Sequence, residues 1–110
     1  MDRAPIDYLP GTLETLVLKT LTHGPMHGYG IARWIEEQTD RTLPVEEGSL
    51  YPALYRMEAR GWIDAEWGMS ELGRRAKFYR LTRQGRQQVA ADTRAWNLFA
   101  QAVNKVMVSS

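Results

Sequence analysis

The segment EEGSLYPALYRMEARGWIDAEW, residues 46–67, changes its hydrophobic period partway along, and this change decides the fold. Its first part has apolar residues one helical turn apart, at Leu50, Leu54 and Met57. They predict a helix over about residues 47–60. Pro52 lacks an N–H and is tolerated best in a first turn, so the helix should begin close to Ser49, a good cap residue. Gly61 is typical of the left-handed residue that ends a helix.

The second part of this segment has the period of a strand. Ile63, Ala65 and Trp67 alternate with acidic residues, which is the signature of a half-buried β-strand. A polar turn over residues 68–73, bounded by glycines, leads to residues 75–81, whose aromatic and basic side chains predict a returning strand. The two strands form a β-hairpin with a long polar tip, which is typical of a wing.

Two further helices are predicted upstream. The first opens at Pro10-Gly11, and its apolar residues recur at helical spacing: Leu13, Leu16, Val17 and Leu21. The run His23-Gly24-Pro25 ends it, because a residue before proline disfavours helical geometry. A second helix fits about residues 28–39, with an apolar face of Ile31, Trp34 and Ile35. Three short helices and a hairpin predict a mainly α fold with a small β-hairpin (α+β), a winged helix-turn-helix unit over residues 9–81.

Residues 82–107 predict a long last helix, capped by Thr82. Its apolar seam keeps alternating spacings of four and three: Val89, Thr93, Trp96, Ala100, Val103 and Met107. Such a seam favours packing against another helix along its length. Roughly 26 residues span about 39 Å, which is longer than a domain of about 80 residues is wide. We therefore expect a homodimer joined through this helix; the alternative is a helix that folds back on its own domain.

Composition limits the class of protein. The chain has 110 residues, 44% hydrophobic and 25% charged, as in an ordinary globular domain. The absence of cysteine excludes a disulfide framework and a thiolate metal site. No apolar run is long enough for a transmembrane helix, and the N-terminal MDRAPIDY lacks the apolar core of a secretory signal. We expect a cytoplasmic protein with no membrane partner.

Charge is distributed unevenly, although the net charge is only +1. Residues 1–73 carry twelve acidic and six basic residues, whereas residues 74–110 carry eight basic residues and one acid. Six of these cations lie between Arg74 and Arg86, with no acid among them. Such a stripe can meet phosphates whatever the total charge is, and its alternative is a solvated face. The solvated interpretation is favoured for Arg83 and Arg86.

A helix-turn-helix with a wing predicts duplex DNA as the ligand. The polar face of the third helix offers hydroxyls and one cation for phosphates or base edges: Ser49, Tyr51, Tyr55 and Arg56. The wing offers three cations, each able to neutralise a phosphate: Arg74, Arg75 and Lys77. The two tyrosines have a structural alternative, which is packing at the edge of the core.

Catalysis and metal binding find little support in the sequence. His23 and His27 lie four residues apart, but Gly24-Pro25 interrupts the continuous helix that a paired-histidine site requires, so both are interpreted as turn residues. No nucleophile with a base and no phosphate-cradling glycine loop can be assembled. We expect neither an enzyme nor a bound metal or cofactor.

The stretches LPGTLETLVLKTLTHGPMHGYGI (9–31), EEGSLYPALYRMEARGWI (46–63) and GRRAKFYRLTRQGR (73–86) resemble the PadR family of bacterial transcriptional regulators. The single C-terminal helix resembles the short subfamily, which lacks a longer C-terminal domain. The resemblance implies a homodimeric winged-helix repressor that binds a palindromic operator and is released by a small molecule or another signal.

The same resemblance implies roles for individual residues. Ser49, Tyr51 and Pro52 match the recognition-helix motif, and Arg74, Arg75 and Lys77 match the wing. Tyr29 matches the tyrosine of the HGY motif, near the DNA backbone. In some short members a tryptophan at the position of Trp96 lines a pocket between subunits for planar aromatic compounds. Here the neighbouring seam residues Val89, Thr93 and Ala100 are small, and Lys19 is a further candidate for this pocket.

Three hypotheses about function remain open at this point. The favoured one is a dimeric DNA-binding repressor. The second is a small-molecule sensor or carrier, because two copies of Trp96 near a two-fold axis could stack a flat aromatic ligand between them; the structural alternative is an aromatic residue in the dimer core. The third is a winged helix that binds proteins and has lost DNA binding, suggested by the acidic residues Glu46 and Glu47 at the start of the third helix.

Overall fold

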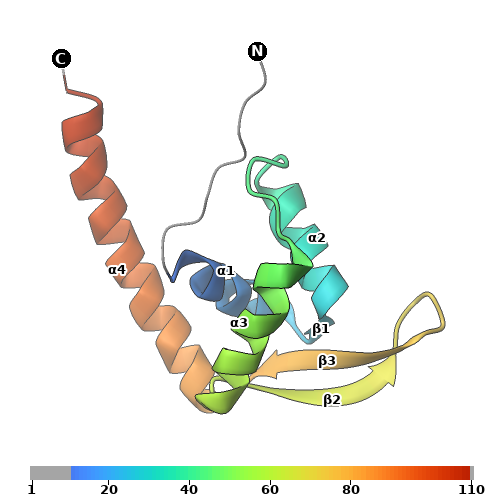
Figure 1. Cartoon of the computed structure of the whole chain (residues 1–110). Helices are drawn as coiled ribbons and strands as arrows, with labels where there is room; N and C mark the ends of the chain where they lie inside the picture. Colours follow the sequence, from blue (N-terminus) through green and yellow to red (C-terminus); the bar gives the residue numbers. More distant parts are fainter. Residues whose placement is uncertain (1–10, 110) are drawn as a thin grey trace.

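The computed structural model describes residues 11–109. In chain order the elements are α1 (Thr12–Thr20), the short 3-10 turn η1 (Leu21–His23), β1 (Met26–His27), α2 (Gly28–Gln38), α3 (Glu47–Ala59), β2 (Ile63–Met69), β3 (Arg75–Leu81) and α4 (Arg83–Met107). The strands form an antiparallel sheet in the order β1-β3-β2. Figure 1 shows α1, α2 and α3 grouped beside this sheet, with α4 rising away from them. This is the mainly helical winged helix that the sequence predicts; Pro10, the predicted opening of the first helix, lies outside the described residues.

One core joins these elements. Leu13, Val17 and Leu18 on α1 meet Ile31 on α2 and Leu54 on α3, and all five are buried. The predicted apolar faces of the first three helices are therefore the ones that face inward. Leu16 and Trp34, also predicted on these faces, are only partly buried against the core.

The start of α3 differs from the prediction, because Ser49 does not cap the helix. The helix begins at Glu47 after Glu46, and the Ser49 N–H already donates to the Glu46 carbonyl oxygen at 3.0 Å. The start is fixed by Val45, two residues before the helix, which is buried and donates its backbone N–H to the Glu36 carboxylate at 2.9 Å. Pro52 consequently lies inside the helix rather than in its first turn.

The sheet corrects two further expectations. The hairpin gains a third strand, β1, whose Met26 and His27 pair with Tyr79 and Phe78 of β3. Trp67 is 57% exposed, although its alternation with acidic residues predicted an inward side chain. The reason is that β2 extends past the core: Ile63 is buried near its start, whereas the hairpin beyond it projects away from the helices (Figure 1).

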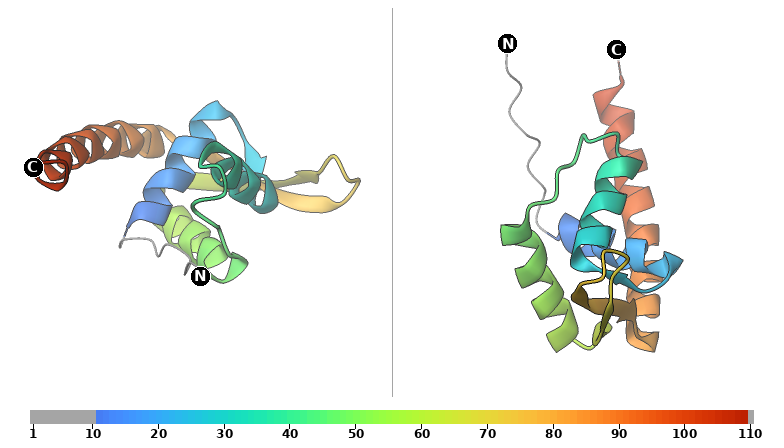
Figure 2. Two further views of the ribbon diagram at one scale, coloured as in Figure 1. Left: turned by 90° about the horizontal axis from the view of Figure 1, so that it is seen from above. Right: turned by 90° about the vertical axis from the view of Figure 1, so that its right-hand side faces the viewer.

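The first part of α4 packs on its own domain. Val89 is buried, and the Thr15 hydroxyl of α1 donates to the Asp92 carboxylate at 3.3 Å. Beyond this region the large apolar residues of the helix are exposed, among them Trp96, Leu98, Phe99, Val103, Val106 and Met107. Figure 2 shows that α4 and the hairpin extend to opposite sides of the helical core. Folding back on the domain is therefore confined to the N-terminal part of the helix.

The end of α3 and the start of α4 are held together by a small group of contacts, called the junction here. Gly61 ends α3 in the predicted left-handed conformation, with φ 79°. The Thr82 hydroxyl donates to the Gly61 carbonyl oxygen at 2.6 Å and accepts from the Gly85 N–H at 3.0 Å, which confirms Thr82 as the cap of α4. A Cβ at Gly85 would collide with the Trp62 carbonyl oxygen, so only glycine allows this approach. The junction fixes the direction in which α4 leaves the domain.

Candidate nucleic-acid interface

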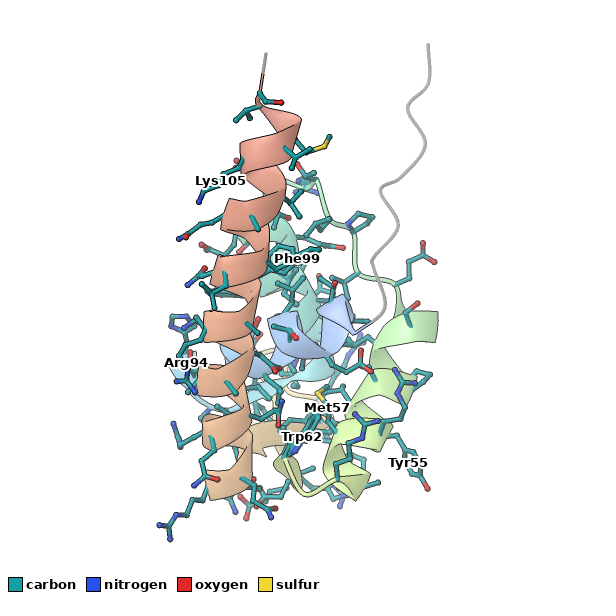
Figure 3. The ribbon with its side chains drawn as sticks, turned by 90° about the vertical axis from the view of Figure 1, so that its left-hand side faces the viewer. Tyr55, Met57, Trp62, Arg94, Phe99 and Lys105 are labelled. Carbon is teal, nitrogen blue, oxygen red and sulfur yellow. The ribbon has the colours of Figure 1, made fainter. Side chains whose placement is uncertain are left out.

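The outer face of α3 is polar and open to solvent. All five residues that the sequence singles out on this helix are exposed: Ser49, Tyr51, Pro52, Tyr55 and Arg56. Tyr55 is the more exposed of the two tyrosines on α3, with 75% of its surface open to solvent, and Figure 3 shows its ring pointing away from the domain. Packing at the edge of the core, the alternative for the tyrosines, does not describe Tyr55.

Tyr51 lies over the start of α2. A Cβ built on Gly28 would be 2.5 Å from the Tyr51 hydroxyl oxygen and less than 3 Å from its ring, so the ring rests on the bare glycine backbone. Nearby, the pKa of the Tyr79 hydroxyl is raised, mainly by burial and further by the charges of Glu58 and Tyr51. Tyr51 is thus packed against Gly28 on one side and remains 44% exposed as a whole.

Arg56 is held by an ion pair. Its guanidinium donates to the Glu14 carboxylate of α1, with the Nη2 at 2.9 Å and the Nε at 3.3 Å. An exposed ion pair of this kind contributes little to stability, and a phosphate or guanine could replace Glu14 as the acceptor. In the free chain, however, Arg56 is not an unpaired cation.

The cations of the predicted basic stripe lie on different surfaces. Arg75 and Lys77 are on the sheet face that continues the core, where the Lys77 ammonium lies 3.8 Å from Glu58 of α3. Arg80 is on the other face and donates to Asp64 at 2.7 Å. This hydrogen bond and charge raise the pKa of Arg80 above its ordinary value. Arg80 is neutralised locally and does not belong with the wing cations.

The hairpin tip carries the least restrained cation of the wing. Within residues 11–109 the Arg74 guanidinium has no ion-pair partner, while its backbone N–H donates to the Ser70 hydroxyl at 3.3 Å. The Arg75 guanidinium lies 4.8 Å from the ring centre of Trp67, a cation–π arrangement. Trp67 therefore orients the guanidinium of Arg75, whereas its alternation pattern predicted only a side chain that faces the core.

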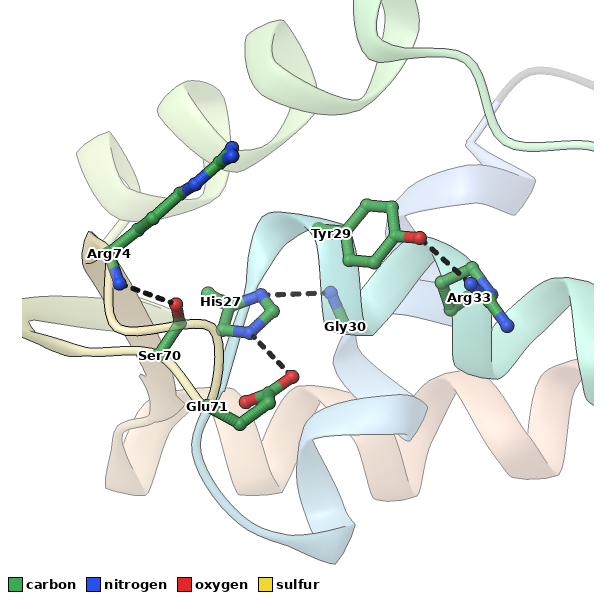
Figure 4. A network of polar contacts seen from close by, with 7 residues as sticks. All are labelled: His27, Tyr29, Gly30, Arg33, Ser70, Glu71 and Arg74. Atoms are coloured by element: carbon green, nitrogen blue, oxygen red, sulfur yellow. Dashed lines mark hydrogen bonds and ion pairs between the residues drawn. The ribbon is translucent and has the colours of Figure 1, made fainter.

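Polar contacts on α2 complete the surface, and Figure 4 shows them with the hairpin tip. The Arg33 Nη1 donates to the Tyr29 hydroxyl at 2.8 Å, and the same guanidinium lies 3.3 Å from Glu37. These hydrogen bonds raise the pKa of Arg33, with the largest contribution from Tyr29. Tyr29 is exposed, so its hydroxyl and the Arg33 charge are presented together.

The model of the transcriptional regulator PadR-like family matches residues 17–91, which include α2, α3 and the wing. The chain belongs to the PadR-like family of transcriptional regulators. A transcriptional regulator of Mycobacterium tuberculosis is 35% identical over 71 residues, 64% of this chain and 65% of that protein. The family and this relative share the role of transcriptional regulator.

Solved structures of similar proteins agree with the fold. A transcriptional regulator from Clostridium thermocellum is 32% identical, with a TM-score of 0.77 over 86% of this chain and 89% of that one. A PadR-like transcriptional regulator from Bacillus cereus is 27% identical, with a TM-score of 0.78 over 91% of this chain and 95% of that one. Because 91% coverage leaves fewer residues unmatched than the 25 of α4, the match extends into the long last helix, and the PadR-like architecture goes beyond the winged helix.

The residues considered for a small-molecule pocket in this PadR-like regulator differ in how far they are buried. Val89 is part of the core of the chain itself, and Lys19 is exposed on α1. Thr93 and Ala100 are half-buried on α4, and the Trp96 ring lies 6.1 Å from the ring of Phe99. On the described part of α4, Trp96 and its neighbour Phe99 offer an exposed aromatic surface.

The two histidines of the PadR-like chain have separate structural tasks. The His23 ring packs against Trp34 at 4.8 Å, and the His27 ring accepts the Gly30 N–H at 3.0 Å as the cap of α2. Among the described residues no group of three or more metal-ligating side chains could hold a metal ion. None of the helices between residues 11 and 109 is long and apolar enough to cross a bilayer.

Sequence reasoning missed three contributors to this surface: His27, Arg33 and Trp67. His27 was interpreted only as a turn residue, although its position before a glycine-rich helix start could have indicated a cap. Arg33 follows Tyr29 by four residues, a spacing that brings side chains together on a helix. Trp67 had no comparable signal, because the point at which the hairpin leaves the core is a tertiary property.

Proposed function

We propose that this PadR-like regulator is a homodimeric DNA-binding repressor. The observation that carries the proposal is the combination, on one chain, of an exposed polar α3 and a wing whose Arg74 has no ion-pair partner among the described residues. Residues 9–81 form the DNA-binding unit. α3 enters the major groove, and the wing follows the phosphate backbone.

Base reading by α3 is sparse in this proposal. The helix offers the hydroxyls of Ser49, Tyr51 and Tyr55, with Pro52 shaping its outer face. Arg56 reads guanine only after it leaves Glu14. The wing cations Arg74, Arg75 and Lys77 supply the general attraction to phosphates, and Tyr29 contacts the backbone beside them.

The dimer forms through residues 82–107. α4 has 25 residues and so measures about 37 Å, and its distal half exposes an apolar stripe that includes Trp96, Phe99 and Val103. An apolar stripe of this length is buried from water only when another surface packs on it. The same stripe on a second copy of α4 fits it, because the alternating spacing of four and three is typical of helices that pack along their length. Two recognition helices about 34–36 Å apart then require a pseudo-palindromic operator.

Replacing Arg74 and Arg75 together by alanine tests the wing. Binding to all duplex sequences should weaken by about tenfold or more, because two charge-assisted contacts are lost. The plot of log affinity against log salt should become shallower by about two, since each phosphate contact releases about one counterion. Fluorescence anisotropy titrations at several salt concentrations measure both quantities.

The matched control is the Arg83→Ala, Arg86→Ala double variant, which removes the same charge from exposed positions on α4. It should leave the salt slope nearly unchanged. An equal change of slope in both double variants would show that the effect depends on net charge, and an unchanged slope in the wing variant would remove the wing from the mechanism.

Gly28→Ala tests the placement of Tyr51. The new methyl group must displace the Tyr51 ring, which has an exposed side toward which it can move, so operator affinity should fall roughly three- to tenfold. The free energy of unfolding should change by less than about 1 kcal/mol. Anisotropy and thermal unfolding measure the two effects, and Gly30→Ala is the control, because its Cβ meets only an ordinary contact at 3.4 Å. Affinity equal to that of the unmodified chain would exclude Tyr51 from the interface.

A second candidate function is a sensor that binds planar aromatic compounds between its two subunits, around Trp96. The exposed Trp96 and Phe99 pair favours it, with Thr93, Ala100, Val89 and Lys19 as the further candidates that the family resemblance implies. A flat dye should quench tryptophan fluorescence in the unmodified dimer and not in Trp96→Ala. Quenching that persists in this variant would assign the signal to one of the other three tryptophans.

A further inference from the structure

Among the residues that the structure describes, one ion pair links the hairpin tip to the body of the domain. Glu71, between β2 and β3, places its carboxylate Oε1 3.6 Å from the Nε2 of His27 at the start of α2 (Figure 4). At this distance the contact is electrostatic rather than a well-formed hydrogen bond. His27 is largely buried, with 12% of its side chain exposed, whereas 75% of Glu71 is exposed. The fixed partner is therefore the histidine.

Two ring contacts and the strand pairing of its backbone hold His27 in place. The Nδ1 accepts the Gly30 N–H at 3.0 Å, and the Phe78 ring packs edge-on at 5.3 Å between ring centres. His27 also pairs with Phe78 in the sheet. A ring nitrogen that accepts a hydrogen bond carries no proton, so the neutral ring has its proton on Nε2, directed to Glu71.

Glu71 also lies in a stretch of sequence whose other charged residues are basic. It is the only acidic residue between Glu66 and Asp92, a stretch that contains all the wing cations. A carboxylate free to move at the tip would stand beside Arg74 and repel the phosphates that Arg74 attracts. The pKa of Glu71 is lowered, first by its own backbone N–H and then by His27, so it is ionised near neutral pH.

We infer that His27 is a positioning residue for the wing: its Nε2 holds Glu71 against the body of the domain, which orders the hairpin tip and keeps the carboxylate away from DNA. Arg74 and Arg75 are then preorganised rather than ordered on binding, which reduces the entropic cost of the complex. The order of the tip is a property of the free chain. The consequence for affinity rests on the proposed DNA binding.

His27→Asn separates the two tasks of the histidine. Asparagine is a good N-cap, and its Oδ1 can accept the Gly30 N–H in place of Nδ1, so α2 keeps its cap. Its side chain is too short to reach Glu71. His27→Ala loses both contacts and should therefore lower the melting temperature as well, which His27→Asn should not.

Amide hydrogen exchange in the free protein is the direct test. Three tip amides are hydrogen-bonded, those of Ser70, Gly73 and Arg74, and they should exchange roughly two- to fivefold faster in His27→Asn, as the loss of an exposed electrostatic contact allows. Glu71→Ala should give the same increase, and the double variant no more than either single one. Unchanged exchange in His27→Asn, or additive increases in the double variant, would overturn the inference.

Operator titrations give the second readout. His27→Asn should lower affinity by roughly two- to fivefold while leaving the salt slope as it is, because the same phosphates are contacted in the complex. A reduced slope would mean that His27 itself meets a phosphate and would contradict the positioning role. A chain that binds no DNA at all would refute the proposed function, while the exchange experiment would still decide whether His27 orders the wing.

Discussion

Phe99→Asp combined with Val103→Asp is expected to give a folded monomer that has lost most of its operator affinity. Both residues lie on the exposed apolar stripe of α4, beyond the part of the helix that packs on α1. Dimerisation would bury four new carboxylates without partners, which costs several kcal/mol or prevents association. A lone subunit also loses the advantage of two linked reading helices, so affinity should fall by roughly 10²- to 10⁴-fold.

Sedimentation equilibrium and operator titration measure these two effects. Leu98→Asp is the control, because position 98 is about 160° around the helix from the centre of the stripe. The Leu98 side chain is 70% exposed, more than that of Phe99 or Val103. This control should remain dimeric and bind normally. A double aspartate variant that stays dimeric would place the subunit contact elsewhere on the chain.

Gly85→Ala is expected to destabilise the domain more than any other single methyl group added to a described glycine. The new Cβ would occupy the position of the Trp62 carbonyl oxygen, and both partners are backbone, so the start of α4 must move away from the end of α3. Overpacking of this kind costs about 2–3 kcal/mol, although alanine is the better helix former by about 1 kcal/mol. The melting temperature should fall by roughly 10 °C.

Gly48→Ala is the control for the intrinsic preference of alanine. Gly48 is also helical, but no atom lies within 4 Å of its built Cβ, so this substitution should be neutral or stabilise by up to about 1 kcal/mol. Thermal unfolding of both variants by circular dichroism makes the comparison. Equal stability of the two variants would show that the junction of Gly61, Thr82 and Gly85 is looser than its contacts indicate.

The elements of this fold could be predicted because their signals are local. Helical spacing placed α1 and α2, the change of period after Gly61 placed the hairpin, and Thr82 marked the start of α4. Each of these signals lies within a few residues of the structure that it specifies. The apolar seam of α4 could also be predicted, because its spacing and the length of the helix both follow from the sequence alone.

The details of the interface could not be predicted, because they depend on residues that are distant in sequence. The sequence predicted Arg56 as the one cation that the third helix offers to DNA, but the fold brings Glu14 of α1 to it across 42 positions. The start of α3 depends on Val45 being anchored by Glu36, and β1 is only two residues long, too short for a periodic signal. His27 likewise acquires its second contact only when the hairpin returns to α2.

Selection of bound duplexes from a random library, carried out at low and at moderate salt, tests the central claim most directly. The claim is that two subunits joined through α4 present two α3 helices to the same side of a DNA duplex. The predicted result is an enriched pseudo-palindrome with half-site centres about 10–10.5 base pairs apart, or a multiple of that spacing, and weaker recovery as salt rises. Enrichment of a single asymmetric site, or no enrichment even at low salt, would contradict it.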